Sequence, residues 1–502
     1  MKSLWTAFAL VVFPMSAFST EINVWFGDSG IPPYLPEATA VQHSTFNSSV
    51  MGQLFEVDDN NQVSPKALSN FSYNQERKEF ILELPQELRF HNGRKVTTID
   101  FKFSLLRGLF SSKKNFYLLY LKEVVGISAS KNYASFEELM NDKVIGIRIL
   151  DSKRVSITLI RDNPNFIYMF CKGYFHLVPR EELDSDLFTW RKLPIGVGPY
   201  KVSSIDFEKG VAVLELFNRL KNPLSPTKVN YYFKKRPLGL EPDVLPFEEI
   251  ATQNLPVYNL YEYQNIESIS MFMTNNVNRL GRDQDFRRLI YGLLDREAIS
   301  AQIRGTLPAY ENLPRVFGGN IGKELINRES LKKKYAIIME DLKKNGLPIL
   351  CFSPSSGVKT LKPILINMFK LQGIEVTFID SNDKFPSKEI SEKSPLRLTG
   401  KIVDFFDPSF LFVSLLDASP YFYQRSLDKH LEELNKEFLS EENKEKRHIL
   451  TKAISEYVAN KAYDIPILEK KRILAFKISK ISTLGMQTQP LILKFENIRT
   501  VH

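Results

Sequence analysis

Side chains of the kinds that carry out catalysis are scattered along this 502-residue chain. The six histidines are His43, His91, His176, His430, His448 and His502. The sequence contains no Gly-x-Ser-x-Gly elbow, P-loop, His-Glu-x-x-His motif or Rossmann glycine fingerprint. We therefore expect a protein that is not an enzyme and has no cofactor and no metal, although residues distant in sequence leave a metal site open.

The two cysteines, Cys171 and Cys351, are far apart and each lies in an apolar run. They could pair in an oxidising compartment. The apolar surroundings favour buried free thiols instead. There is no Cys-x-x-Cys spacing typical of a zinc or redox site.

The composition indicates a globular protein of two or three domains. It is 43% hydrophobic, 25% charged and 12% aromatic, with a net charge of +9 from 67 basic and 58 acidic residues. Both signs are spread along the chain, and no basic stripe is interleaved with aromatic residues. We therefore expect no binding to nucleic acid.

The first nineteen residues have the pattern of a secretory signal peptide. Lys2 precedes the apolar run Leu4 to Phe13, and Ala17-Phe-Ser19 is a small-x-small cleavage site. A buried N-terminal strand or helix is the alternative interpretation. No Cys follows the apolar run, so there is no lipobox for a lipid anchor, and no other segment is apolar enough to span a membrane. We expect a soluble protein in the periplasm.

The elements that must position any site change in character along the chain. Strands dominate the first half, and helices alternate with strands in the second half. Thr97 and Asp100 form a capping-box-like start to one helix. The expected strands are Phe80–Leu84, Arg154–Leu159, Val211–Phe217, Val229–Phe233, Ile349–Phe352 and Ile374–Ile379, and the expected helices are Thr97–Arg107, Leu331–Lys344, Leu361–Leu371, Leu427–Leu439 and Glu441–Ala462.

Three of these helices carry more specific predictions. Pro363 should lie in the first turn of its helix, so that strand, helix and strand form a β-α-β unit. The last two helices should be lined by apolar side chains. These are Leu431, Leu434 and Phe438 in the first, and Ile449, Leu450, Ala453, Ile454 and Val458 in the second.

The segment from Asp285 to Ser300 predicts a buried helix, a tight corner and a second helix. We expect Asp285 to cap the first helix and Asp295 to cap the second. The apolar stripe of the first helix consists of Phe286, Leu289, Ile290, Leu293 and Leu294. Such a stripe indicates scaffold rather than a binding surface.

Five segments in order resemble the solute-binding components of peptide-type ABC transporters. They are Leu54 to Ser104 with Val63-Ser-Pro-Lys-Ala-Leu68 and Phe90-His-Asn-Gly93, Pro194-Ile-Gly-Val-Gly-Pro-Tyr200, Asp285 to Ser300, Arg304-Gly305 with Pro308-Ala309, and Asp404-Phe-Phe-Asp-Pro408 followed by Ile465-Pro-Ile467. The match is inexact. Val197 stands where Thr is usual in the family, and Ala67-Leu68 reverses the family's usual order, Leu-Ala.

The resemblance implies an α/β fold, a bilobal clam-shell of the three-region type with mixed sheets flanked by helices. The implied regions are a signal peptide at 1–19, a first lobe built from 20–45, 170–264 and 479–502, an extra subdomain of this lobe at 46–169, and a second lobe at 265–478. The ligand is expected to bind between the lobes, which close around it.

The resemblance also implies a binding residue. In the peptide-binding members, an Asp three residues before an acidic-Pro pair binds the ligand's α-ammonium group, and Asp404 occupies that position ahead of Asp407-Pro408. A carboxylate in a water-poor cleft is costly unless a cation pairs with it, which suits this role. Alternatively, Asp404 caps a turn or pairs with a nearby Lys.

The other candidate ligand contacts surround this aspartate. Lys401 stands where an aromatic residue is usual, and Lys401 or Arg397 could bind a ligand carboxylate or phosphate or point to solvent. The remaining candidates are Phe405 and Phe406 as an apolar wall, and Tyr34, Asn275 and Asn276 as polar contacts.

We therefore predict a monomeric, exported substrate-binding component of an ABC importer that presents a short peptide to permease subunits in the inner membrane. Two adjacent prolines in Gly30-Ile-Pro-Pro-Tyr34 remove backbone donors that family members offer to a peptide. The alternatives are a non-peptide solute, such as a metal chelate, haem or an anionic compound, and an exported adaptor without a transport role.

Overall fold

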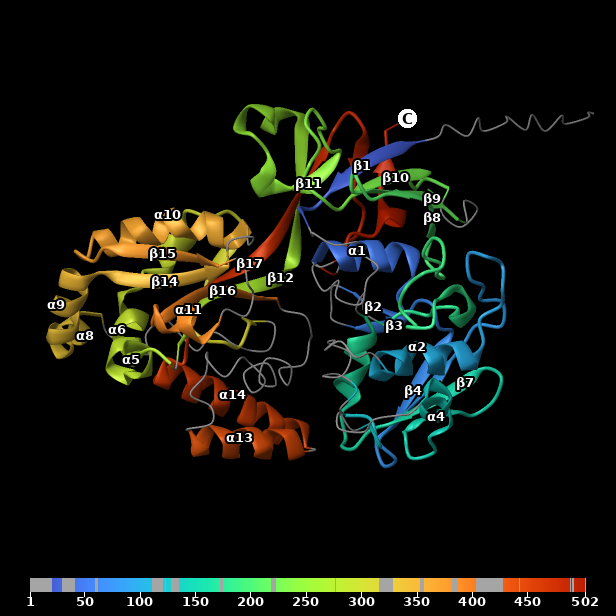
Figure 1. The fold of residues 1–502 in the computed structure, drawn as a ribbon, viewed down its shortest axis with the longest axis horizontal. Helices are drawn as coiled ribbons and strands as arrows, with labels where there is room; N and C mark the ends of the chain where they lie inside the picture. The colour runs from blue at the N-terminus through green and yellow to red at the C-terminus, as the bar shows by residue number, and fades with distance from the viewer. Residues whose placement is uncertain are drawn as a thin grey trace, which may run out of the picture.

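The computed structural model shows two lobes joined at the centre of the molecule (Figure 1). The first lobe contains β1, β8 to β11 and helices α1, α2 and α4. The second contains β14 to β16 and helices α5 to α11, α13 and α14. The structure describes residues 20–28, 41–58, 62–110, 121, 123–127, 135–171, 175–217, 223–275, 277–315, 328–352, 356–381, 387–402, 428–441, 443–487, 489 and 492–501.

One mixed sheet runs through both lobes in the order β15-β14-β16-β12-β17-β11-β1-β10-β9-β8, with β13 also paired to β17. Its strands are β1 Glu21–Trp25, β8 Tyr200–Asp206, β9 Val211–Leu216, β10 Lys228–Tyr232, β11 Val244–Pro246, β12 Tyr258–Thr274, β13 Thr306–Pro308, β14 Leu347–Phe352, β15 Val376–Ser381, β16 Leu396–Ile402 and β17 Asp464–Lys477. The parallel pair of β14 and β15 is joined by α10, which confirms the predicted β-α-β unit.

Strands β12 and β17 link the two lobes (Figure 1). They pair in antiparallel fashion from Tyr258 opposite Lys477 to Met273 opposite Asp464, with register shifts near Ile266 and Ser270. In the first lobe β17 also pairs with β11, and in the second lobe β12 also pairs with β16. Bulges bend a strand and increase its twist. The register shifts therefore allow the same pair of strands to belong to two halves of the sheet that are oriented differently.

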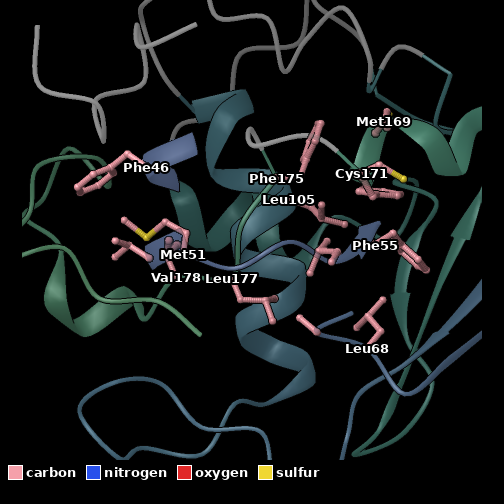
Figure 2. Close-up of a cluster of buried hydrophobic side chains, with 14 of the residues drawn as sticks. Phe46, Met51, Phe55, Leu68, Leu105, Met169, Cys171, Phe175, Leu177 and Val178 are labelled. Carbon is pink, nitrogen blue, oxygen red and sulfur yellow. The ribbon is translucent and has the colours of Figure 1, made fainter. Parts of the chain in front are cut away.

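The first lobe packs its helices and a smaller sheet around one continuous hydrophobic core. The aromatic residues Phe46, Phe55 and Phe175 contribute to the part of this core in Figure 2. The remaining elements are α1 Val41–Val50, α2 Thr98–Phe110, α4 Phe136–Asn141, the pair β2 Phe55–Val57 and β3 Val63–Pro65, and the sheet of β4 Asn70–Asn74, β5 Glu79–Glu83, β6 Ile147–Ile149 and β7 Arg154–Thr158. The predicted strands are thus confirmed to within one or two residues at either end.

The capping box at the start of α2 is confirmed. The backbone N–H of Thr97 donates to Asp100 Oδ2 (2.8 Å), and the backbone N–H of Asp100 donates to Thr97 Oγ1 (3.3 Å). Two backbone donors that the helix leaves without an internal partner are thereby satisfied.

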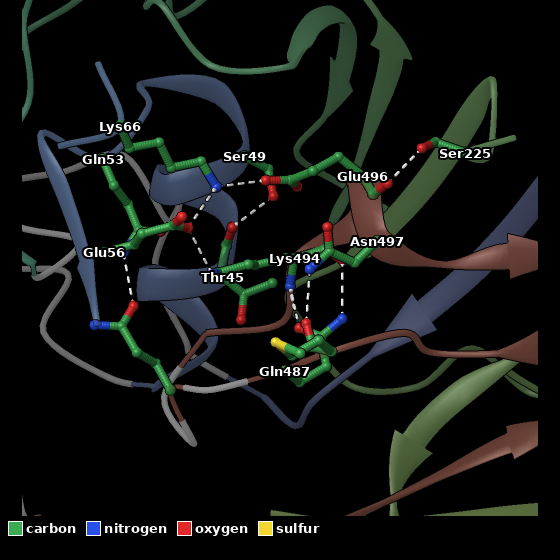
Figure 3. A network of polar contacts seen from close by, with 12 residues as sticks. Thr45, Ser49, Gln53, Glu56, Lys66, Ser225, Gln487, Lys494, Glu496 and Asn497 are labelled. Carbon is green, nitrogen blue, oxygen red and sulfur yellow. Dashed lines mark hydrogen bonds and ion pairs between the residues drawn. The ribbon is translucent and has the colours of Figure 1, made fainter. Parts of the chain in front are cut away.

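The end of the chain is tied into the first lobe by a polar network (Figure 3). Lys494 forms an ion pair with Glu56 (2.7 Å), and Glu496 forms one with Lys66 (2.7 Å). The backbone N–H of Leu493 donates to Thr45 on α1 (3.1 Å). These contacts fasten the tail, which contains β18 Ile481–Thr483 and β19 Arg499–Thr500, to elements more than 400 residues earlier.

The described helices of the second lobe are α5 Arg279–Arg282, α6 Gln284–Leu293, α7 Arg296–Ser300, α8 Arg328–Lys334, α9 Ala336–Asn345, α10 Ser356–Lys370, α11 Lys388–Glu392, α13 Lys429–Ser440 and α14 Lys444–Lys461. Four predictions about these helices were wrong. Asp283 caps α6, accepting from the backbone N–H groups of Asp285 and Phe286, so the prediction that Asp285 is the cap was wrong. Asp295 caps α7 as predicted.

The other three corrections concern helix limits and faces. The single helix predicted at 331–344 is two helices, because Tyr335 leaves the helical conformation (φ −112°, ψ 33°) with its ring buried. α10 begins at Ser356, so Pro363 lies inside it and removes one backbone donor from its interior. Ile449 is 64% exposed, because the buried stripe of α14 runs through Leu450, Ile454 and Val458.

Both cysteines are free and buried, which confirms the favoured interpretation. Cys351 Sγ lies 3.1 Å from Asp380 Oδ1. Burial, followed by this hydrogen bond, raises the pKa of the thiol to about 11. Cys351 is therefore protonated at neutral pH and acts as a small packing residue.

The five predicted apolar positions of α6 are all buried, and two arginines of the same segment are buried with them. Arg287 donates to the backbone carbonyls of Gly281 (3.2 Å), Arg282 (2.7 Å) and Lys461 (3.1 Å). Arg296 donates to the carbonyls of Tyr291 (3.0 Å) and Pro466 (2.8 Å). Each guanidinium thus satisfies carbonyl groups of several segments at once, which supports a scaffolding role.

We predict that Arg287→Gln lowers the free energy of unfolding by about 3 kcal/mol, because several charge-assisted hydrogen bonds are lost and buried carbonyls lose their donors. Urea denaturation measures this change. Arg288→Gln, on the same helix, removes one exposed bond to the carbonyl of Asn460 (2.9 Å) and should cost less than about 1 kcal/mol. Equal losses in the two variants would contradict the scaffolding role.

His91 connects two of the segments that carry the family resemblance. Its Nε2 lies 2.9 Å from the carbonyl oxygen of Gly198, and its Nδ1 lies 3.4 Å from the backbone nitrogen of Gly196. These contacts assign the proton to Nε2, because Nδ1 faces a donor. Burial lowers the pKa of His91 to about 4 from its ordinary value of 6.5.

We predict that His91 makes the fold sensitive to mild acid. Its contribution to stability is fully present above its ordinary pKa and is lost as the pH falls toward about 4, because the unfolded chain takes up the proton first. One such group contributes at most about 1.4 kcal/mol per pH unit. Urea denaturation between pH 7 and 4 measures how steeply the free energy of unfolding falls with pH. His91→Asn should make this fall less steep, whereas the same exchange at exposed His448 should leave it unchanged.

Candidate functional site

The candidate site lies where β16 meets the two linking strands. β16 pairs with β12 from Leu396 opposite Thr274 to Ile402 opposite Ser268. β12 pairs on its other side with β17. The sheet therefore brings the predicted binding segment, which starts in β16, to the strands that join the lobes.

Several predicted ligand contacts lie outside the described residues. These are Asp404, Phe405, Phe406, Tyr34 and Asn276. They stay predictions, as do the domain boundaries given above.

Arg397 and Lys401 both belong to β16. Arg397 is 7% exposed and pairs with Met273, which also pairs with Asp464 on β17. Lys401 pairs with Ile269, which also pairs with Glu469 on β17. Directly paired residues on neighbouring strands face the same side of a sheet. The register therefore places Arg397 on the same face as Asp464, two strands away.

Asn275 has a structural role in the described contacts. Its amide nitrogen donates to the carbonyls of Ser391 and Ser394 (the latter 2.9 Å), and its oxygen accepts from the backbone N–H of Val277 (3.1 Å). These bonds fix the end of β12 to the turn that enters β16. The sequence-based prediction of a ligand contact for Asn275 is untested.

The sequence-based reasoning missed a set of buried polar residues on β17 and the segment after β13. Glu469 is 2% exposed and accepts from the Arg315 backbone N–H and Nε, each at 3.0 Å. Asp464 is fully buried and accepts from Asn312 Nδ2 (2.6 Å), while Glu311 accepts from Ser455 Oγ (2.7 Å). The available signal was a glutamate in the otherwise apolar run Ile465-Pro-Ile-Leu-Glu469.

Burial raises the pKa of Glu469, Arg315 opposes this shift, and the charge of Glu311 adds to it. We predict that Arg315→Met lowers the free energy of unfolding at pH 7 by about 2 kcal/mol, because it leaves a buried carboxylate without its cation. The expected loss of stability is smaller than for a fully buried ion pair, because the Arg315 side chain is 35% exposed.

The double variant Arg315→Met/Glu469→Gln should recover most of this loss in urea denaturation, because a neutral amide replaces the unpaired charge. The single variant should also regain stability as the pH falls and Glu469, whose pKa is raised by burial, takes up a proton. If the double variant is as unstable as the single one, the ion pair is not the cause of the loss.

In the part of the chain that the structure describes, no three His, Cys, Asp or Glu side chains form a group that could hold a metal ion. No helix of that part is long and apolar enough to cross a membrane.

Comparison with known proteins identifies this framework. Residues 62–233 match the family model of bacterial extracellular solute-binding proteins, family 5 Middle. The predicted family resemblance is confirmed over these residues. The described architecture is the bilobal α/β fold of the family 5 solute-binding proteins, and the family match and the similar structures are binding proteins rather than enzymes.

Three solved structures illustrate the similarity of fold. The periplasmic oligopeptide-binding protein OppAIV of Borrelia burgdorferi has a TM-score of 0.76 and 17% identity, with 96% of this chain and 100% of that chain covered. The murein tripeptide binding protein MppA of Escherichia coli has a TM-score of 0.74 and 15% identity, with 97% and 99% covered. NikA of Brucella suis in complex with Fe(III)-EDTA has a TM-score of 0.74 and 14% identity, with 96% and 100% covered.

A search of curated proteins finds no match. At these identities the solved structures show the fold alone. The family 5 fold therefore accommodates peptides in some proteins and a metal chelate in another, and the ligand of this chain is a separate question.

Proposed function

We propose that this protein is the exported substrate-binding component of an ABC importer, that it binds a short peptide between its lobes, and that it presents the peptide to permease subunits in the inner membrane. The secretory pattern of residues 1–19 supports export to the periplasm. The family 5 fold supports the receptor role.

The observation that carries this proposal is the course of β16. This strand runs along β12 up to Ile402, opposite Ser268, and the sequence Asp404-Phe-Phe-Asp-Pro408 follows directly. A carboxylate at the junction of two closing lobes suits the α-ammonium of a peptide, because lobe closure removes the water that would weaken the pairing. Arg397 and Lys401 on the same strand supply positive charge for a terminal carboxylate.

A non-peptide solute is the second candidate. The chelate complex of the Brucella suis protein has the same fold, and the adjacent prolines of Gly30-Ile-Pro-Pro-Tyr34 cannot donate backbone hydrogen bonds to a peptide. Native mass spectrometry of the freshly isolated protein separates the two candidates, because the mass of retained cargo identifies a peptide, a chelate or an anionic compound. An adaptor without a transport role would carry no cargo and would bind no member of a solute library.

We predict that Asp404→Asn weakens the binding of a di- to pentapeptide mixture by about tenfold to a hundredfold, because one charge-assisted hydrogen bond to the ligand ammonium is replaced by a neutral one. Isothermal titration of refolded, cargo-free protein measures the effect. N-acetylated peptides, which lack the ammonium, should bind both proteins equally weakly.

The matched control is Asp407→Asn, which changes the same type of side chain three residues away and should retain most of the affinity. Equal affinity of the wild type and Asp404→Asn for peptides with a free N-terminus would exclude Asp404 as the ammonium anchor. Absence of binding to any peptide by the wild type would contradict the peptide function itself.

A further inference from the structure

Strand β17 changes its partner along one edge as it passes from the second lobe to the first. Its other edge is taken by β12, so β13 and β11 follow one another along the same edge, β13 at residues 468–470 and β11 at residues 474–476. The ladder with β12 shifts register at the same place, between Ile473 and Lys471. Regular pairing is therefore broken or shifted on both edges of residues 471–473, which makes them the pivot between the lobes.

Two contacts join the lobes beside this pivot. Lys470 Nζ forms an ion pair with Glu248 (2.9 Å), which belongs to the 3-10 helix η3 Phe247–Glu249 directly after β11. The guanidinium of Arg304 lies over the ring of Phe247, 5.5 Å from its centroid. The acidic and the aromatic partner thus belong to the first lobe. The two cations lie on the second-lobe side of the pivot.

The loop that carries Arg304 is fixed to β17. The backbone carbonyl of Gly305 accepts from the backbone N–H of Lys471 (2.7 Å). Gly305 has a φ of +72°, and a Cβ at this position would lie 2.8 Å from Ile473 Cδ1. Only glycine suits both the backbone conformation and the close approach. Arg304 therefore keeps its place on the second-lobe side when the lobes move.

The segment with η3 lies on the outer side of the pivot. In Figure 1 the green first-lobe segment after β11 lies above the linking strands, whereas α13 and α14 of the second lobe and α2 and α4 of the first lie below them. A rotation that brings the lower helices together draws the lobes apart on the upper side, because the pivot lies between the two sides. Lobe closure therefore weakens both contacts.

We propose that Phe247 and Glu248, by binding Arg304 and Lys470, form a latch that holds the lobes open. This inference rests on the proposed function, in which the lobes close around the ligand, and adds a control on that closure. A contact made in only one arrangement of the lobes shifts the equilibrium toward it and lowers the apparent affinity for a ligand that needs the other.

The ion pair of the latch is partly exposed to solvent. The side chains of Lys470 and Glu248 are 23% and 29% exposed. Ion pairs in such a position are weak and are screened by salt. The latch is therefore strong enough to bias the equilibrium between open and closed lobes, and weak enough for a ligand to overcome.

The test measures the arrangement of the lobes without a ligand. Spin labels at Asn141→Cys, on α4 of the first lobe, and Glu433→Cys, on α13 of the second, report the distance between the lobes in double electron–electron resonance. Both labelled positions are exposed, whereas Cys171 and Cys351 are buried. The measurement therefore follows closure directly in the cargo-free protein.

Glu248→Lys replaces the attraction to Lys470 by repulsion. It should raise the ratio of closed to open molecules by about threefold to tenfold. This effect should shrink in about 0.5 M salt, because dissolved ions screen the charges. Phe247→Leu, which removes the ring beneath Arg304 and keeps an apolar side chain, should raise the ratio by a smaller factor. Glu249→Lys makes the same charge change at the next residue and is the matched control, which should keep the wild-type ratio.

The possible results separate the latch from the proposed function. An unchanged distance distribution in Glu248→Lys, a shift to longer distances, or an equal shift in Glu249→Lys would overturn the latch. Isothermal titration with the di- to pentapeptide mixture should show binding about threefold to tenfold tighter for Glu248→Lys than for the wild type. If no peptide binds although the distances shift, the latch is supported and the peptide function is contradicted.

Discussion

The antiparallel ladder between β12 and β17 is the interaction on which the rest of the structure depends. Each strand belongs to both lobes, so the hydrogen bonds of one ladder set the relative position of two hydrophobic cores. The register shifts near Ile266 and Ser270 divide this ladder into parts that need not twist together. A short, bulged connection of this kind lets two rigid bodies rotate without disturbing either core.

The same ladder divides its apolar side chains between different hydrophobic clusters of the second lobe. Phe272, Ile465 and Ile467 belong to the core beneath α6, whereas Ile269, Met271 and Met273 belong to other clusters. The segment from Asp285 to Ser300, one of the five that carry the sequence resemblance, packs on the first of these cores, and its arginines bind carbonyls of several segments. The buried side chains of this segment serve the fold, so the segment carries no information about the ligand.

The sequence was a good guide wherever structure depends on near neighbours. The capping box of Thr97 and Asp100 and the apolar stripe of α6 could be predicted, because each depends on residues within a few positions. Choosing Asp285 over Asp283 as a cap failed because both residues suit the role, and only the position of the first turn decides between them.

The polar contacts of the site could not be predicted in this way. Asn275 is fixed by carbonyls more than 110 residues later, and Glu469 is buried by β12, β13 and Arg315. Nothing within ten residues of either position signals these partners. The bilobal α/β fold could thus be predicted through the family resemblance, whereas the partners of polar side chains on the linking strands depend on pairings distant in sequence.

The buried ion pair of Glu469 and Arg315 shows what a charge inside this fold requires. Glu469 on β17 is 2% exposed and accepts from the backbone N–H and Nε of Arg315, each at 3.0 Å. Apolar residues of similar size often pack at such a position at lower cost, whereas removal of the cation alone leaves a buried carboxylate unpaired. The ion pair therefore constrains the segment after β13 to stay against β17, one of the two strands that link the lobes.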